Sequence, residues 1–500
     1  MSKTYDSRLA EAQLQQAGLL VEAADSAVSF SGISNNSKNA KAGDLFICKG
    51  AGFKSAYLQM AKELGAVCYV AESRVEGVDL PCILVNNSFK AQSILSRWFF
   101  ENPSDEFTLV GVTGTKGKTT TTYMTHAVMN AVAGCRTGMT SGVDLDVGGG
   151  EVVESHLTTP DSLELQQLYA QARDHALPIV TSEISSQAYK VHRVFGQHFD
   201  YCIFLNISPD HISPTEHPDF EDYFECKLQL LDNSDVAVIC RDTAEFETVY
   251  CRAQAACRRV CLVGKTEDCD YRFHDIVKQP SGYTFLVTEK DSGQTYPYSI
   301  MMDGQFNIKN AVAAIAVGRM MGGDPAKIAE ELKDVTVAGR ADVYTCADLT
   351  VVINYMHNGI SCTEALQDLQ KDYPGAYIVV VIGMAGERSA GRFIDIGQVC
   401  GQYADRVFFS SEDPGFDDPY VVTQQMAEAA AGGKAEVIVE VDRTKAVEQA
   451  ILDAPKGSVV VLAGKGNETT MRVRGQYIPY ESDPGIMRRV QPLRAKMYQE

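Results

Sequence analysis

Short apolar runs alternate with amphipathic stretches along the chain. In the N-terminal part, helical spacing covers Arg8–Gln16, Ala56–Gly65 and Phe89–Phe100, and short apolar runs cover Asp44–Ile47, Ala66–Val70 and Cys82–Val85. Apolar residues three or four positions apart indicate one face of a helix, whereas a short apolar run indicates a buried strand. This alternation predicts a small α/β domain over residues 1–105, which ends in a turn-rich linker at Glu101–Asp105.

The same alternation continues to the C-terminus. Strand-like runs lie at Thr108–Val112, Ile179–Ser182, Tyr201–Leu205, Val236–Cys240, Thr350–Ile353, Tyr377–Ile382, Arg406–Phe409 and Ser458–Leu462, with helical stretches between them. Strands separated by helices predict parallel sheets. A chain of 500 residues is also too long for one core. We therefore expect two further α/β domains, at residues 106–337 and 338–500.

Composition narrows the class of protein. The chain is 45% apolar, which excludes a largely disordered protein, and its formal net charge is -20. This negative charge argues against nonspecific binding to nucleic acid or to an anionic membrane. We see no apolar run that would span a membrane and no signal peptide. The sequence therefore predicts a cytoplasmic protein without membrane insertion and without a nucleic-acid partner.

The 14 cysteines contain no Cys-x-x-Cys pair. Five of them lie close together in the sequence, which raises the question of a zinc site: Cys240, Cys251, Cys257, Cys261 and Cys269. Their spacing fits no common zinc-ligand pattern. Buried, reduced thiols are the interpretation that we favour.

A glycine-rich segment between a predicted strand and a predicted helix carries the clearest chemical signal. It reads Val110-Gly-Val-Thr-Gly-Thr-Lys-Gly-Lys-Thr-Thr-Thr-Thr122. Such a turn presents backbone N–H groups to a phosphate at the positive end of a helix. The match to the general pattern is imperfect, because Val112 stands where a glycine is usual. We predict ATP binding by Gly114, Thr115, Lys116, Gly117, Lys118, Thr119 and Thr120, with Lys118 on the outer phosphates and the Thr119 hydroxyl on Mg²⁺.

Two polar motifs directly follow predicted strands. Glu183 comes after Ile179–Ser182, and His211 ends the motif that follows Tyr201–Leu205. Because the carboxyl ends of parallel strands meet at one edge of a sheet, we expect both side chains beside the phosphates. Each residue taken alone is more often a capping or structural group. Together they predict ligands for a divalent metal, Mg²⁺ or Mn²⁺.

For other residues, the local pattern does not decide between a functional and a structural role. Lys227 reads as a solvated lysine on the amphipathic helix Asp219–Leu231. Asn307 and Asn310 share one face of the predicted helix Asp303–Gly318, where they fit an adenine edge or a helix cap. Arg340 and Arg388 fit contacts with phosphate and carboxylate, and surface ion pairs explain them equally well.

Together these motifs resemble the Mur ligases, the ATP-dependent amide-forming enzymes of peptidoglycan precursor synthesis, along essentially the whole chain. Four segments resemble the lysine-adding branch, which acts on UDP-N-acetylmuramoyl-L-alanyl-D-glutamate: Ser185–Tyr189, Val191–Val194, Glu216–Pro218 and Phe220–Phe224. The resemblance implies a uridine-nucleotide domain, a central ATPase domain and a C-terminal Rossmann-like domain for the amino acid. It also implies that ATP phosphorylates a substrate carboxylate and that an amine attacks the acyl phosphate. We expect a monomer.

The resemblance further implies a role for individual residues. It assigns catalysis to Lys118, Glu183, His211 and Lys227, and metal ligation to Thr119, Glu183, His211 and a carbamylated Lys227. It assigns the nucleotide to Asn307, Asn310, Arg340 and Asn354 in addition to the phosphate loop. It assigns the muramoyl-peptide substrate to Ser37, in the uridine motif, and to Thr158, Thr159, Ser185 and Arg193. It assigns the incoming amino acid to Arg388, Asp413, Gly464 and Glu468.

Three motifs depart from the family pattern. Asn354 stands where the family has an aspartate, and residues 339–342 read Gly-Arg-Ala-Asp in place of Gly-Arg-Met-Glu. Diaminopimelate-adding relatives carry Asn-Pro-Arg, whose arginine binds the distal carboxylate, whereas this chain has Glu412-Asp-Pro-Gly415, with Asp417 and Asp418 nearby. The resulting negative field favours a distal ammonium, so we predict lysine as the substrate.

Other functions remain open at this point. A paralogue that adds another diamino acid, such as diaminopimelate or ornithine, would explain the departures. A nucleotide-binding regulatory protein with decayed catalysis is a second alternative, although it would have little need of Lys118, Glu183 and His211. Folylpolyglutamate synthetase shares the ATPase core but should lack the N-terminal uridine domain.

Overall fold

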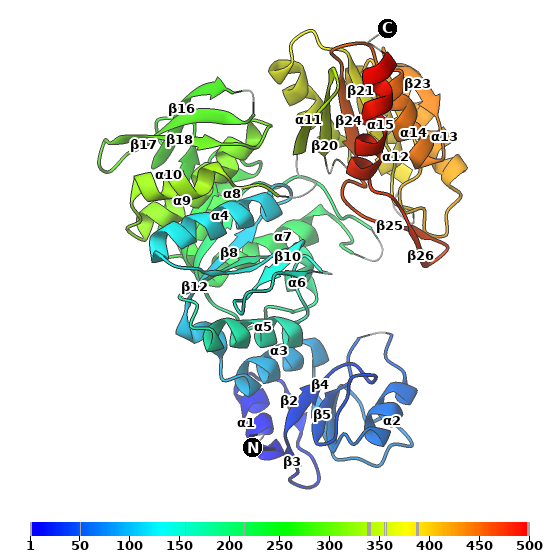
Figure 1. The fold of residues 1–500 in the computed structure, drawn as a ribbon. Coiled ribbons are helices and arrows are strands. Elements are labelled where there is room, and N and C mark those ends of the chain that lie inside the picture. The colour runs from blue at the N-terminus through cyan, green and yellow to red at the C-terminus, as the bar shows by residue number, and fades with distance from the viewer. Residues whose placement is uncertain are drawn as a thin grey trace. The chain divides into compact units, whose positions relative to one another are not determined.

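A computed structural model describes residues 3–50, 52–155, 157–213, 216–279, 281–337, 342–354, 356, 358–386 and 390–497 (Figure 1). The predicted α/β class with parallel sheets is confirmed. The chain forms two compact units, one of Met1–Ile212, Glu216–Val263 and Ala313–Ile328, the other of Ser213–Thr215, Gly264–Val312 and Ala329–Glu500. No helix in the described part of the chain is long and apolar enough to cross a membrane.

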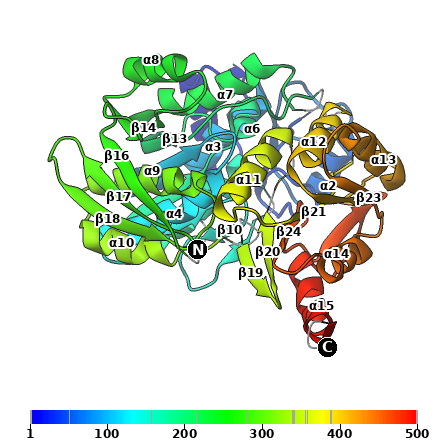
Figure 2. The ribbon, with the colours of Figure 1, turned by 90° about the horizontal axis from the view of Figure 1, so that it is seen from above.

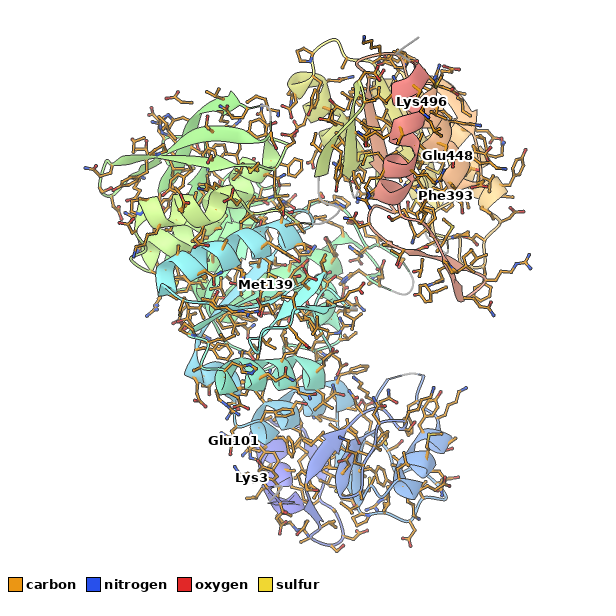
Figure 3. The ribbon with its side chains drawn as sticks, in the orientation of Figure 1. Lys3, Glu101, Met139, Phe393, Glu448 and Lys496 are labelled. Carbon is orange, nitrogen blue, oxygen red and sulfur yellow. The ribbon has the colours of Figure 1, made fainter. Side chains whose placement is uncertain are left out.

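A five-stranded sheet of order β2-β7-β6-β5-β4 forms the N-terminal part of the first unit. Its strands are β2 (Leu20–Glu22), β4 (Gly32–Ser34), β5 (Asp44–Ile47), β6 (Cys68–Ala71) and β7 (Cys82–Val85), and its helices are α1 (Ser7–Gln16), α2 (Ser55–Glu63) and α3 (Ser88–Phe99). Side chains alternate across the strands, so Leu45 and Ile47 pack with α1 and α3, whereas Phe46 packs with α2. At the surface, Lys3 pairs with Glu101 (Figure 3), an exposed ion pair of little energetic weight.

The central sheet of the first unit is parallel in the order β9-β12-β8-β13-β14-β15. Its strands are β8 (Thr108–Thr113), β9 (Gly138–Thr140), β12 (Ile179–Glu183), β13 (Phe199–Phe204), β14 (Ser234–Cys240) and β15 (Arg259–Gly264). The short strands β10 (Asp144–Asp146) and β11 (Val153–Glu154) extend it antiparallel at one edge. Thus β8, which leads into the phosphate loop, lies in the interior of the sheet.

Helices cover both faces of this sheet (Figure 1). One face carries α5 (Ser162–Asp174), α6 (Ser186–Lys190), α7 (Phe220–Asp232) and α8 (Phe246–Ala256), and the other carries α4 (Lys118–Ala133) and α9 (Phe306–Met320), which α10 (Pro325–Lys333) follows. Residues 311–317 of α9 are wholly buried, as expected of a helix that is apolar all round. At Gly318 this helix approaches α4 so closely that a β-carbon would lie 2.3 Å from Val128 Cγ1.

A six-stranded sheet of order β19-β20-β24-β21-β22-β23 dominates the second unit. Its strands are β19 (Asp342–Cys346), β20 (Leu349–Asn354), β21 (Ile378–Ile382), β22 (Arg406–Phe409), β23 (Glu436–Val439) and β24 (Val459–Ala463), all parallel except β19. Figure 2 shows α11 (Gly359–Asp372), α12 (Ala390–Tyr403) and α13 (Pro419–Ala430) on one face, and α14 (Arg443–Leu452) and α15 (Asp483–Met497) on the other. This is the doubly wound arrangement of a Rossmann-like domain.

Two smaller antiparallel elements complete the second unit. They are the run β16 (Tyr271–Lys278), β17 (Tyr283–Glu289) and β18 (Thr295–Ile300), and the hairpin β25 (Thr470–Val473) and β26 (Gln476–Pro479). The predicted linker contains a 3₁₀ turn at Pro103–Glu106. The domain boundaries at 105 and 337 stay predictions. All fourteen cysteines are free, but of the five that lie close together in the sequence Cys251 is exposed and Cys257 half-buried, so the prediction of buried thiols is wrong for these two.

The close approach at Gly318 yields a stability prediction. In a helix, Gly→Ala ordinarily gains about 1 kcal/mol, but overpacking costs about 1–3 kcal/mol. Val128 is β-branched and stiff within α4, so it yields little space. We expect Gly318→Ala to lower the urea midpoint of unfolding. Gly432→Ala, where the new β-carbon meets no atom within 4 Å, should leave the midpoint unchanged; equal midpoints for both variants would contradict the steric argument.

Candidate active site

The glycine-rich segment forms a tight turn from β8 into α4. Gly117 has a left-handed backbone (φ 82°) and caps α4, and Gly114 (φ 155°) lies against the next strand connection. A β-carbon at Gly114 would be 2.9 Å from Leu205 Cβ. Because glycine has no side chain to cap the first turn of α4, the N–H groups there suit an anion. The geometry supports a phosphate site where the sequence predicts one.

Asn206 holds this loop in place through hydrogen bonds, and we call it the loop clamp. This role was not predicted from the sequence. Its Oδ1 accepts from the Lys116 N–H at 2.8 Å, and its Nδ2 donates to the Lys116 carbonyl at 3.1 Å. Its own carbonyl accepts from the Thr115 N–H at 2.9 Å. Three hydrogen bonds from one residue after β13 therefore hold the loop in shape. Its place directly after a predicted strand was the available signal.

Two lysines share one carbonyl oxygen. The Nζ of Lys118 and the Nζ of Lys227 both donate to the carbonyl of Gly114, at 3.1 Å and 2.8 Å. Lys227 is only 2% exposed, so the solvated lysine suggested by its local pattern is wrong. Burial, and secondarily the charge of Lys118, lower the pKa of Lys227 well below its usual value, against the opposing charges of Asp210 and Glu183. The site favours the neutral amine.

Glu183 and Thr119, both predicted metal ligands, lie next to each other. The Thr119 hydroxyl donates to Glu183 Oε1 at 3.2 Å, and the Gly142 N–H donates to Oε2 at 2.8 Å. Glu183 is buried at the end of β12, in register with Val112 of β8. A carboxylate and a hydroxyl are hard oxygen donors, which are the ligands that Mg²⁺ prefers. These two residues fit a magnesium site beside the phosphate loop.

His211, the third predicted ligand, has a left-handed backbone (φ 56°) in the loop after β13. Its Nδ1 lies 3.0 Å from Glu216 Oε1, a partner that orients the ring. The ring stacks on Tyr223 with centroids 5.9 Å apart, and Lys227 Nζ lies 4.8 Å from the centroid of the same tyrosine. The structure thus brings His211 and Lys227 together around one aromatic ring.

A second group of possible metal ligands lies nearby. Ligand atoms of His217, Asp222 and Cys226 all lie within 4.8 Å of one another. However, His217 already contacts Asp222 Oδ2 at 2.6 Å through Nδ1 and Ser186 Oγ at 3.0 Å through Nε2. Lys190 also pairs with Asp222 at 2.6 Å. With both ring nitrogens occupied, we interpret this group as a structural network that links α6 to α7.

The predicted muramoyl-peptide residues gather on one side of this unit. The Thr159 hydroxyl donates to the Glu183 carbonyl at 2.9 Å and accepts from the Ser185 N–H at 3.0 Å. Arg193 Nη1 donates to the Thr159 carbonyl at 2.8 Å. Thr158 precedes this network, with its Cα 3.3 Å from the β-carbon that Gly142 lacks. The network places Thr159 and Ser185 beside the predicted metal ligand Glu183, with Arg193 bonded to Thr159.

Asp161 connects this substrate side to the N-terminal sheet. Its carboxylate accepts from Asn35 Nδ2 at 3.0 Å and pairs with Lys49, and both partners belong to the N-terminal part. Ser37, predicted to contact the uridine, is buried two residues after Asn35. Neither Asp161 nor Lys49 is among the residues predicted from the sequence.

The structure describes only some of the other residues that are predicted to bind the nucleotide. Asn307 and Asn310 are buried; Asn307 Nδ2 donates to the Asp303 carbonyl at 2.6 Å, and Asn310 Nδ2 donates to Asn307 Oδ1 at 3.1 Å. Their contact with adenine stays a prediction. Asn354 ends β20, in register with Ala463. Arg340 and Arg388 lie outside the described residues.

In the second unit, an acidic group surrounds a buried lysine. Lys465 is 2% exposed and pairs with Asp413 at 2.7 Å and with Glu468. Beside them, burial raises the pKa of Glu412 to about 7, and its Oε2 has no hydrogen-bond partner among the residues that the structure describes. Gly464 makes room for it, because a β-carbon there would lie 2.0 Å from Oε2.

This group confirms the acidic surroundings that the sequence suggests, and it adds Lys465, which the sequence analysis missed. Two carboxyl groups, those of Asp413 and Glu468, thus share one lysine, and the buried Glu412 lies within the electrostatic reach of Arg443 and Lys465. The position of Lys465 between two glycines directly after a strand was its only sequence signal.

The fold and the loop define an ATPase of the phosphate-loop class whose buried lysine and carboxylate suit phosphoryl transfer to an acid. A model of the Mur ligase middle domain matches residues 112–318, and a model of the Mur ligase glutamate ligase domain matches residues 339–466. The chain belongs to the Mur ligase family, whose members are ATP-dependent, ADP-forming ligases.

Individual relatives cover nearly the whole chain. A UDP-N-acetylmuramyl-tripeptide synthetase of Latilactobacillus sakei is 36% identical over 93% of this chain and 94% of the relative. A UDP-N-acetylmuramoyl-L-alanyl-D-glutamate–L-lysine ligase of Streptococcus mutans is 34% identical over 92% of each chain. The crystal structure of MurF from Acinetobacter baumannii has a TM-score of 0.68 at 15% identity, over 98% of this chain and 99% of the other, which shows the shared fold.

The loop clamp yields a binding prediction. Asn206→Ala removes two side-chain hydrogen bonds to Lys116, each worth about 0.5–1.5 kcal/mol. We expect nucleotide affinity to fall by roughly tenfold, as measured by calorimetric titration with ADP. Asn86→Ala, which removes a bond at the surface of the N-terminal domain, serves as the control. Unchanged ADP affinity in Asn206→Ala would show that the loop keeps its shape without the clamp.

Proposed function

We propose that this protein is a cytoplasmic, monomeric ligase that uses ATP to join L-lysine to UDP-N-acetylmuramoyl-L-alanyl-D-glutamate in peptidoglycan precursor synthesis. The observation that carries the proposal is the pair of lysines on the Gly114 carbonyl, beside the Thr119–Glu183 contact. The names of the two relatives support the substrates. Fourteen free cysteines agree with a reducing compartment.

The reaction follows from the chemistry of a carboxylate, which is a poor electrophile until one oxygen becomes a leaving group. The loop N–H groups and Lys118 bind the ATP phosphates, while Thr159, Ser185 and Arg193 orient the muramoyl-peptide. A substrate carboxylate oxygen attacks the γ-phosphorus and ADP leaves. The amine of lysine then attacks the acyl carbon, loses a proton, and expels phosphate from the tetrahedral intermediate. Mg²⁺ bound by Thr119 and Glu183 would neutralise charge on the phosphoryl oxygens.

Lys227 supports this assignment through its chemistry. A neutral amine is a nucleophile, and its attack on CO₂ forms an N–C bond and releases one proton, which leaves a carbamate. The lowered pKa of Lys227 favours the neutral amine that this step needs. The resulting carboxylate would place an anion where the neutral amine was, near Glu183 and His211, and so complete a set of metal ligands.

The acidic group in the second unit supports lysine as the incoming amino acid. Asp413 and Glu468 both pair with Lys465, so their two carboxylates carry more negative charge than this lysine balances, and Glu412, whose pKa burial raises to about 7, adds its ionised fraction. A distal ammonium gains from this field, whereas a distal carboxylate is repelled by it. Because diaminopimelate carries such a distal carboxylate, this field disfavours it.

The substrate assignment is tested with purified protein, ATP, Mg²⁺ and UDP-N-acetylmuramoyl-L-alanyl-D-glutamate. We expect phosphate release to depend strongly on lysine and only weakly on diaminopimelate or ornithine across a panel of amino acids. A preference for diaminopimelate would overturn the selectivity argument. No stimulation by any amine would favour a regulatory protein.

The role of Lys227 has its own test. Lys227→Ala should abolish turnover, because it removes the group that becomes the carbamate, and short carboxylates such as formate or acetate should restore part of it. The exposed Lys327→Ala in α10 is the control. Full activity of Lys227→Ala without added carboxylate would refute the carbamate assignment.

A further inference from the structure

We propose that Tyr223 is a positioning residue of the active site: its hydroxyl fixes the phosphate loop at Thr115, and its ring sets the separation of His211 and Lys227. This inference rests on the proposed function in one respect, the assignment of His211 and Lys227 to the metal site. The hydroxyl contact with the loop is independent of that assignment.

The place of Tyr223 in α7 makes both contacts possible. Tyr223 and Lys227 are four residues apart, so they lie on the same face of the helix. The tyrosine is 1% exposed and belongs to the core on one face of the central sheet. Because this buried side chain is held in one position, it fixes the groups that contact its hydroxyl and its ring relative to α7.

The hydroxyl of Tyr223 completes the hydrogen bonding of Thr115. It donates to Thr115 Oγ1 at 3.0 Å, and the Ser208 N–H donates to the same oxygen at 3.0 Å. The Thr115 hydroxyl in turn donates to the Ser208 carbonyl at 3.3 Å. A hydroxyl offers one donor and two acceptor positions, so all the positions of Thr115 are used. The buried tyrosine therefore ties α7 to a loop residue three positions before Lys118.

The ring of Tyr223 carries the other contacts. His211 stacks on it with an interplanar angle of 27° and a centroid distance of 5.9 Å, and Lys227 Nζ lies 4.8 Å from its centroid. His217 packs against it edge-on, with a centroid distance of 5.2 Å. An aromatic ring is flat and has few rotamers, so it defines these separations better than an aliphatic side chain does.

A matched set of variants separates the two contacts. Tyr223→Phe keeps the ring and removes the hydroxyl, whereas Tyr223→Leu removes both. Thr115→Val removes the acceptor and closes a double-mutant cycle with Tyr223→Phe. Tyr250→Phe in α8, whose ring stacks on Phe246, is the control. The measurements are ADP affinity by calorimetry, the ¹³C NMR signal of a carbamate in ¹³CO₂-equilibrated protein, and the melting temperature.

We expect Tyr223→Phe to weaken ADP binding by about tenfold and to keep the carbamate signal, because one buried hydrogen bond to the loop is lost. Thr115→Val should weaken binding at least as much, because it also removes both hydrogen bonds to Ser208, and the double variant should be no weaker than Thr115→Val. Tyr223→Leu should lose the carbamate signal as well. Tyr250→Phe should match the wild type in each measurement.

Unchanged ADP affinity in Tyr223→Phe, or full additivity with Thr115→Val, would overturn the role of the hydroxyl. A retained carbamate signal in folded Tyr223→Leu would overturn the role of the ring, and the double-mutant cycle decides the role of the hydroxyl whether or not that variant folds. Absence of a carbamate signal in the wild-type protein would refute only the proposed modification of Lys227. The double-mutant cycle would still test the hydrogen bond between Tyr223 and Thr115.

Discussion

The parallel pairing of β8 with β12 and β13 is the constraint on which the candidate active site depends. It sets Glu183 opposite Val112 and Phe204 opposite Thr113, so three strand ends meet where the phosphate loop begins. The pairing leaves little space around β8: a β-carbon at Gly111 would lie 2.9 Å from the Phe199 ring. The register of this pairing therefore determines that Glu183 and the loop after β13 meet the phosphate loop at this edge.

Residues that follow directly from this constraint were predictable from the sequence. The phosphate loop has a local signature because its turn requires glycine and its helix must begin beside the phosphates. Glu183 was predictable because a polar residue after an apolar run marks the end of a strand. The alternation of strands and helices likewise predicted the α/β class, since strand and helix periods differ and each is visible in a short window.

Residues whose role comes from distant packing were not predictable. Lys227 has an ordinary helical context, and only the fold shows that it is buried against Gly114, 113 positions away. Tyr223 reads as a core aromatic residue, and Asn206 as a turn residue. Lys465 and Glu412 come from different strand ends, so their proximity depends on sheet order. In each case the chemistry is created by neighbours remote in sequence, which no local periodicity encodes.

Gly464 limits how this enzyme diverges over evolution. Its backbone is left-handed (φ 93°) and its missing β-carbon makes room for the carboxyl group of Glu412. Every other amino acid would place a β-carbon inside that group and would strain the backbone, so a substitution at this position is disfavoured whatever its side chain. In the proposed function, a change of incoming amino acid would therefore require substitution of Asp413 or Glu468, and each of these also pairs with the buried Lys465.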